Sequence, residues 1–76
     1  MTLYEFNMLS QHDKYDITFN EGIFIDSRQE GESRFALYAI DKFFVEIEYR
    51  YLINKIENLR SFRYGALLDK YSNLEL

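Results

Sequence analysis

The sequence contains no cysteine, no long apolar run and no excess of basic residues. The lack of cysteine excludes thiol catalysis and cysteine-bound zinc, and because small secreted domains usually carry disulfides, it favours a cytoplasmic location. No segment is continuously apolar for the roughly 18 residues that a membrane-spanning helix needs. The N-terminus also lacks the charged and then apolar pattern of a signal peptide. We therefore expect a cytoplasmic protein that has no membrane partner.

The charge balance is acidic, with 13 Asp and Glu residues against nine Lys and Arg residues and a net charge of −4. Most of the acidic excess falls within residues 1–33, a pattern that is typical of a solvated helix and loop. A nucleic-acid-binding protein usually carries a basic surface instead. The charge balance therefore predicts no nucleic-acid partner.

The length of 76 residues predicts a single domain, 1–76. A chain this short buries only about 60% of the surface that its unfolded form exposes, so its core is small. Its composition offsets this, because 47% of the residues are hydrophobic and 18% are aromatic.

The stretch Phe35–Phe62 contains most of the apolar residues and predicts the central sheet. Two runs in it, 34–40 and 43–51, alternate with a period of two, which is typical of strands that bury one face. Asp41–Lys42 separates the runs, and Asp at the first place of a two-residue connection is a hairpin signal, although Lys at the second place is less suited than Gly. We predict an antiparallel hairpin here.

Two capping patterns predict a pair of short helices before the sheet. Thr2 and Glu5 match a capping box, and Ser10 can cap a second helix that ends near Glu21, before Gly22. The alternation of aromatic and apolar residues over 15–19 leaves a hairpin as the alternative reading. Residues 22–28 then read as a first strand, followed by a polar loop over 29–33.

The segment 52–63 is ambiguous between a helix and a strand. A turn at Asn54–Lys55 would allow a fourth strand over Lys55–Phe62, with a β-bulge to place its apolar residues. The competing helical stripe consists of Leu52, Ile53, Ile56, Leu59 and Arg63.

Four segments of the chain carry a resemblance to a known family: TLYEFN, EGIFIDSR, LYAIDKFFVEIEY and NKIENLRSFR. On these the sequence resembles a family of small uncharacterised bacterial proteins of the Bacteroidetes type. The resemblance implies an α+β fold with an N-terminal helix or helix pair, a four-stranded antiparallel meander and a short C-terminal helix near 65–71. It implies no activity. The sequence departs from the family at Lys42, where Gly is usual, and over 51–53, where the turn is usually polar.

Two groups of residues could carry chemistry, and both have a simpler structural explanation. Ser10, His12 and Asp13 are the residue types of a hydrolase triad, but such a triad draws on separated segments, and Ser10 and Asp13 are better explained by helix capping. Glu46 and Glu48 share one strand face and could hold a cation, but cross-strand ion pairs are the simpler interpretation.

A third group, Arg60 and Arg63 with Phe62 and Tyr64, combines basic and aromatic side chains. This combination could stack on bases, but the acidic chain favours a role at the sheet edge instead. The sequence therefore predicts no catalytic, cofactor-binding or metal-binding residues.

We predict a non-enzymatic, cytoplasmic protein-interaction module of unknown partner that forms a homodimer. The alternative is a small phage- or mobile-element-derived inhibitor of a host or rival protein. The dimer prediction rests on the 14 aromatic residues, which a small interior has little room to bury. The predicted interaction surface consists of Phe44, Glu46, Glu48, Arg50, Arg60 and Arg63.

Overall fold

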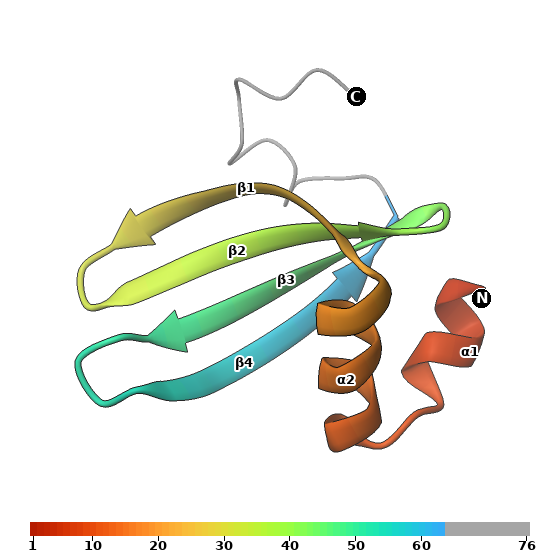
Figure 1. Ribbon diagram of the computed structural model, residues 1–76, viewed down its shortest axis with the longest axis horizontal. Coiled ribbons are helices and arrows are strands. Elements are labelled where there is room, and N and C mark those ends of the chain that lie inside the picture. Colours follow the sequence, from red (N-terminus) through yellow and green to blue (C-terminus); the bar gives the residue numbers. More distant parts are fainter. Residues whose placement is uncertain (64–76) are drawn as a thin grey trace.

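A computed structural model describes residues 1–63 and contains two helices followed by four strands (Figure 1). The elements are α1 (Leu3–Asn7), α2 (Gln11–Glu21), β1 (Ile23–Glu30), β2 (Ser33–Ile40), β3 (Phe43–Arg50) and β4 (Lys55–Phe62). The strands form one antiparallel sheet in the order β1-β2-β3-β4. The predicted α+β fold with a four-stranded meander is confirmed, and the predicted C-terminal helix lies outside the described residues.

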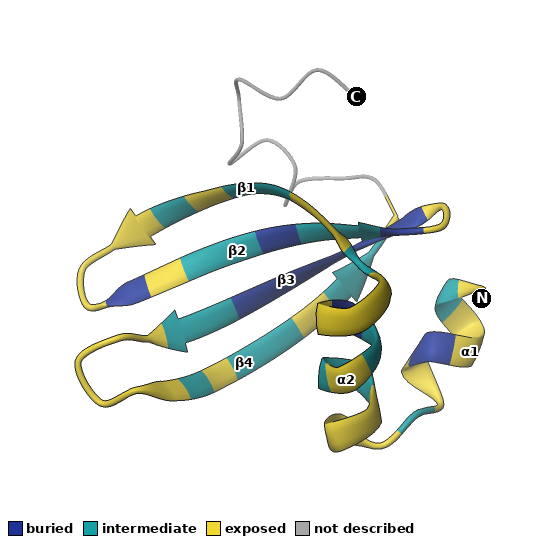
Figure 2. Cartoon of the chain, in the orientation of Figure 1, coloured by how far each residue is buried: buried dark blue, intermediate teal, exposed yellow. Residues whose placement is uncertain are grey.

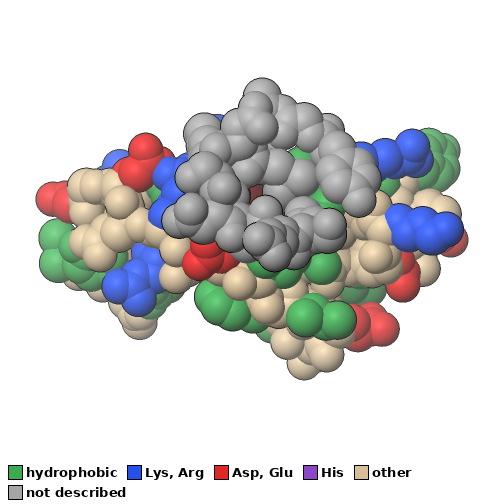
Figure 3. Space-filling model, turned by 90° about the horizontal axis from the view of Figure 1, so that it is seen from above, with side chains coloured by type: hydrophobic (Ala, Val, Ile, Leu, Met, Phe, Trp, Pro, Cys, Tyr) green, Lys and Arg blue, Asp and Glu red, His purple; other side chains and the backbone are tan. Residues whose placement is uncertain are grey.

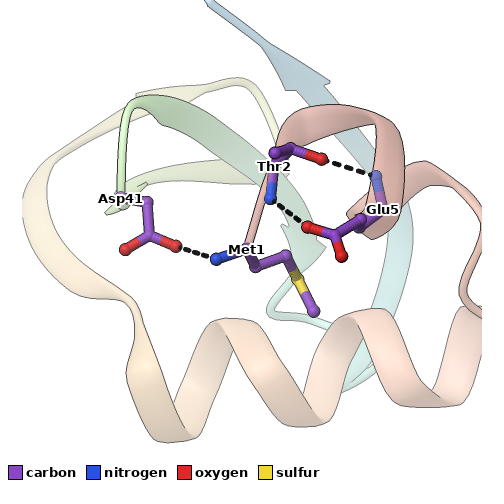
Figure 4. Close-up of polar contacts among 4 residues, drawn as sticks. All are labelled: Met1, Thr2, Glu5 and Asp41. Carbon is purple, nitrogen blue, oxygen red and sulfur yellow. Dashed lines mark hydrogen bonds and ion pairs between the residues drawn. The ribbon is translucent and has the colours of Figure 1, made fainter.

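Both predicted helix caps are present. In α1 the Glu5 backbone N–H donates to Thr2 Oγ1 at 3.1 Å, and the Thr2 backbone N–H donates to Glu5 Oε1 at 2.8 Å, which completes a capping box (Figure 4). In α2 the Asp13 backbone N–H donates to Ser10 Oγ at 3.2 Å. The helix pair with a break near Ser10 is therefore confirmed, and the alternative hairpin over 15–19 is wrong.

The two turns that border β3 each begin or end with a residue of positive φ. Asp41 has φ 50° and Asn54 has φ 53°, a conformation that short polar side chains tolerate. Lys42 has no positive φ, so the β2–β3 turn does not require glycine there. Residues 51–54 form the β3–β4 turn, and β4 begins at Lys55 as predicted.

Each edge strand carries an irregularity in its register. The pairing of β1 with β2 shifts between Phe24 and Asp26, and the pairing of β4 with β3 shifts between Glu48 and Tyr49. At the second shift, Glu57 has no register partner on β3. Ile56 therefore pairs with Tyr49, and the two side chains lie on the same face of the sheet. The bulge that the sequence required in the fourth strand is therefore confirmed.

The helices pack on one face of the sheet, which we name the helix-bearing face. Phe6 of α1 is fully buried and contacts Phe43, with ring centroids 5.3 Å apart. Val45 and Ile47 of β3 complete the centre of this core, and the half-buried Ile17 of α2 packs against it. Figure 2 shows that the buried residues of the sheet follow β2 and β3, whereas β1 and β4 are half-buried or exposed.

A second, smaller apolar cluster lies on the opposite face. Leu37 and Phe44 are buried there, and Phe62 stacks on Phe44 with ring centroids 5.9 Å apart. The side chains of β3 thus alternate between two apolar clusters, which is the period-two pattern that the sequence predicted.

Candidate interaction surface

The structure brings five of the six predicted surface residues together on the opposite face. Phe44, Glu46, Glu48 and Arg50 occupy alternate positions of β3, and Arg60 of β4 is the register partner of Glu46. The sixth residue, Arg63, follows the end of β4.

Two of these residues differ from the expectation that they face solvent. Phe44 is 7% exposed and Glu46 only 2%. Phe44 is covered in part by Phe62, its register partner on β4. Arg50, Arg60 and Arg63 are exposed and Glu48 is half-buried, so the solvent-facing part of this surface is polar.

Glu46 pairs with an arginine that the sequence did not single out. Arg28 Nη2 of β1 lies 3.6 Å from Glu46 Oε2, so its side chain reaches across β2. The same guanidinium contacts Glu30 and lies 4.1 Å from the centroid of the Phe35 ring. No local pattern marks Arg28, because its proximity to Glu46 depends on the registers of two successive strand pairs.

Glu48 and Glu57 also have cross-strand partners. Ser33 Oγ donates to Glu48 Oε2 at 2.8 Å, and Arg50 Nε lies 3.6 Å from Glu57 Oε1. The sequence favoured ion pairs of Glu46 and Glu48 with Arg50, Lys55 or Arg60, whereas in the structure Glu46 pairs with Arg28 and Glu48 accepts a hydrogen bond from Ser33. Among residues 1–63, no group of three or more His, Asp or Glu side chains is placed to hold a metal ion.

His12 does not combine with Ser10 in the structure. Its side chain is 81% exposed, and Nε2 lies 3.1 Å from Asp16 Oδ2, one turn further along α2. The Ser10 hydroxyl instead accepts the hydrogen bond that caps the helix. The three triad residue types are thus explained by the start of α2, as the sequence favoured.

A hollow of about 770 Å³ lies beside the N-terminus. The Met1 amino group donates to Asp41 Oδ2 at 2.6 Å, and this hydrogen bond raises the pKa of the amino group (Figure 4). The hydrogen bonds with Thr2 likewise lower the pKa of Glu5. At the rim of this hollow the Met1 amino group and Asp41 are thus already paired with one another. The described residues that line it are Met1, Thr2, Leu3, Asp41, Lys42, Phe43 and Arg63.

A second hollow of about 280 Å³ lies on the helix-bearing face, and we name it the turn-end groove. The helices pack at the end of the sheet near the β2–β3 turn, and none lies over the end near the other two turns (Figure 1). Because α2 is about 10 Å across and an eight-residue strand is about 27 Å long, α2 does not cover the whole of this face. The described residues that line the groove are Phe19, Arg34, Ala36, Tyr38, Ile47, Tyr49 and Ile56.

The floor and walls of the groove are mostly apolar. Ala36 contributes only a methyl group, and its register partners are Ser27 on β1 and Ile47 on β3. Two small residues on adjacent strands therefore deepen the face beside Ile47. Phe19 of α2 forms one wall, with its ring edge-on to Tyr38 at 6.0 Å, and is 52% exposed.

The β3–β4 turn beside the groove exposes three consecutive apolar residues, which we name the apolar turn. Tyr51, Leu52 and Ile53 are 40%, 66% and 58% exposed. Gln29 Nε2 donates to Tyr51 Oη at 2.9 Å, and Asn54 Oδ1 accepts from Tyr49 Oη. Because Tyr49 lines the groove, the second hydrogen bond holds the end of the turn against the groove wall.

Side chains of several kinds meet at this end of the molecule. Figure 3 shows hydrophobic side chains at the left-hand end, where the β1–β2 and β3–β4 turns lie in Figure 1, next to acidic and basic side chains. The sequence did flag residues 51–53 as a departure from a polar turn, but it gave no sign of the groove beside them.

No family model, curated protein or solved structure matches the chain. The resemblance to a Bacteroidetes-type family therefore stays a prediction. Neither α1 nor α2 has the length and apolar character that crossing a membrane requires.

Proposed function

We propose that this protein is a non-enzymatic, cytoplasmic protein-interaction module that binds through the apolar turn and the turn-end groove. The observation that carries the proposal is the exposure of Leu52 and Ile53, 66% and 58%, directly beside an apolar groove. Apolar side chains that gather at the surface of a small soluble protein usually mark a contact site. We therefore propose an interaction surface on the helix-bearing face, whereas the sequence analysis predicted residues that lie mainly on the opposite face.

The polar groups support a binding role over catalysis. Glu46, Glu48, Glu57 and His12 each contact a partner that accounts for their position in the fold. General acid–base or nucleophilic catalysis needs such groups to converge on a shared cavity. The turn-end groove has one charged residue, Arg34, among the described residues that line it, so its chemistry suits a mostly apolar partner surface.

The test is affinity capture from a bacterial extract with two matched variants. Leu52→Ser with Ile53→Ser removes the apolar turn, whereas Tyr4→Ser with Met8→Ser removes two apolar residues, 73% and 71% exposed, from the region of α1. We expect the native chain and the α1 variant to retain the same proteins, and the turn variant to lose them. Equal retention by all three chains would contradict the proposal.

A further inference from the structure

We propose that a second copy of this chain occupies the turn-end groove, with the apolar turn of each copy inserted into the groove of the other. This inference rests on the proposed function and specifies its partner. The chain carries both parts of such a contact, an exposed apolar pair at Leu52 and Ile53 and an apolar hollow beside them. In a two-fold dimer each contact occurs twice, so a protrusion next to a matching hollow is a self-complementary surface.

The size of the groove suits the two residues of the turn. Its volume is about 280 Å³. A protein cavity of roughly 150 Å³ holds a benzene ring, so this groove has room for two groups of about that size. One Leu and one Ile side chain are each about the size of such a group, so both fit in the groove.

The charge distribution also favours a second copy. The chain has a net charge of −4, so two copies repel one another unless their contact surface avoids the acidic residues. Residues 51–54 carry no charge, and no Asp or Glu is among the described residues that line the groove. The contact therefore places no two carboxylates opposite one another among these residues.

The exposed area predicts a weak dimer. Tyr51, Leu52, Ile53 and Phe19 are 40%, 66%, 58% and 52% exposed, which amounts to roughly 430 Å² per copy at about 200 Å² for each fully exposed side chain. Two copies would bury roughly 860 Å² from these residues, and the half-buried groove residues add to this. Interfaces below about 1,200 Å² belong to weak complexes. We therefore expect a weak dimer that forms only at high protein concentration.

The sheet edges are a less favourable route to the same dimer. The register irregularities lie in the pairing of β1 and of β4, the two edge strands. Bulges twist an edge strand and interrupt its row of free backbone groups, which hinders edge-to-edge pairing between copies. A contact between faces avoids this difficulty.

Sedimentation equilibrium between about 10 μM and 1 mM tests the association. We expect the average mass of the native chain to rise from 9.3 kDa toward twice that value, and the Leu52→Ser, Ile53→Ser variant to stay at 9.3 kDa. The Tyr4→Ser, Met8→Ser variant should behave as the native chain. A native chain that stays at 9.3 kDa at 1 mM, or a turn variant that associates equally well, would overturn the inference.

A disulfide cross-link tests the reciprocal geometry, and the chain is suited to it because it has no cysteine of its own. Ile53→Cys chains are mixed with Arg34→Cys chains under mild oxidation, and Met8→Cys chains mixed with Arg34→Cys chains serve as the control. We expect the 53–34 heterodimer to form at least tenfold faster than the 8–34 heterodimer. Equal rates would overturn the proposed contact. A chain that captures another protein through its apolar turn but stays monomeric would overturn only this inference and leave the proposed function standing.

Discussion

Phe6 is the side chain that holds α1 on the sheet, and its removal gives a large predicted loss of stability. Phe6 is fully buried, and the centroid of its ring lies 5.3 Å from the centroid of the Phe43 ring. Replacing a buried Phe with Ala costs about 3–5 kcal/mol, because the transfer free energy is lost and a cavity remains. A domain of 76 residues has a free energy of unfolding of about 4–11 kcal/mol, so Phe6→Ala should remove a large share of it.

Chemical denaturation measures this loss directly. With a denaturant dependence of about 2 kcal/mol per molar guanidinium chloride, Phe6→Ala should lower the unfolding midpoint by about 1.5–2.5 M. Tyr4→Ala is the matched control, since Tyr4 belongs to the same helix but is 73% exposed, and it should change the free energy of unfolding by less than about 0.5 kcal/mol. If Phe6→Ala costs no more than Tyr4→Ala, α1 does not pack on the sheet and the core assignment is refuted.

Three further changes test separate parts of the fold. Asn54→Val should cost about 1–2 kcal/mol in thermal denaturation, because φ is 53°, and Asn54→Gly should cost less. Glu46 is only 2% exposed, so Glu46→Gln should lower the free energy of unfolding by about 1–3 kcal/mol. Glu57 forms a half-exposed ion pair with Arg50, so Glu57→Gln should lower it by less than about 1 kcal/mol. The backbone N–H and the side chain of Thr2 both lower the pKa of Glu5, so their contribution to stability is present above the ordinary pKa of Glu5 and is lost as pH falls through the lowered value. Thr2→Ala keeps the backbone donor and removes only the side-chain contribution, so it should shift the Glu5 carboxyl titration, followed by NMR, part of the way to higher pH.

The sequence predicts most of the fold because its local signals agree with the tertiary structure. Ser10 and Gly22 delimit α2, and in the structure a Cβ at position 22 would lie 2.4 Å from the Thr18 carbonyl oxygen, which explains why glycine follows the helix. The alternation over 43–51 predicts β3 and its two faces, although β3 ends at Arg50 and Tyr51 belongs to the following turn. In these regions, local propensity and long-range packing favour the same conformation.

The remaining features depend on long-range placement. Over 52–63 the helical stripe and the strand are balanced locally, and only the resemblance favours the strand, which the structure contains over Lys55–Phe62. The first strand extends to Glu30, beyond the predicted end at Arg28, because Glu30 pairs with Ser33 across the turn.

The candidate surface was the least predictable part. The burial of Phe44 and Glu46 depends on what lies across the sheet, and the alternation of residues within β3 does not contain that information. The groove arises because α2 leaves part of the helix-bearing face uncovered beside the small residue Ala36. Both features follow from how the elements pack, which no local pattern specifies.

The central claim is that two copies of the chain meet through the apolar turn and the turn-end groove, and amide spectra recorded at increasing protein concentration test it most directly. As the concentration of the native chain is raised from about 20 μM to 1 mM, we expect changes in amide chemical shift that are confined to residues 51–54 and to groove residues such as Ala36 and Ile56. Spectra that do not change, or changes centred on Glu48, Arg50 and Arg60 of the opposite face, would contradict the account.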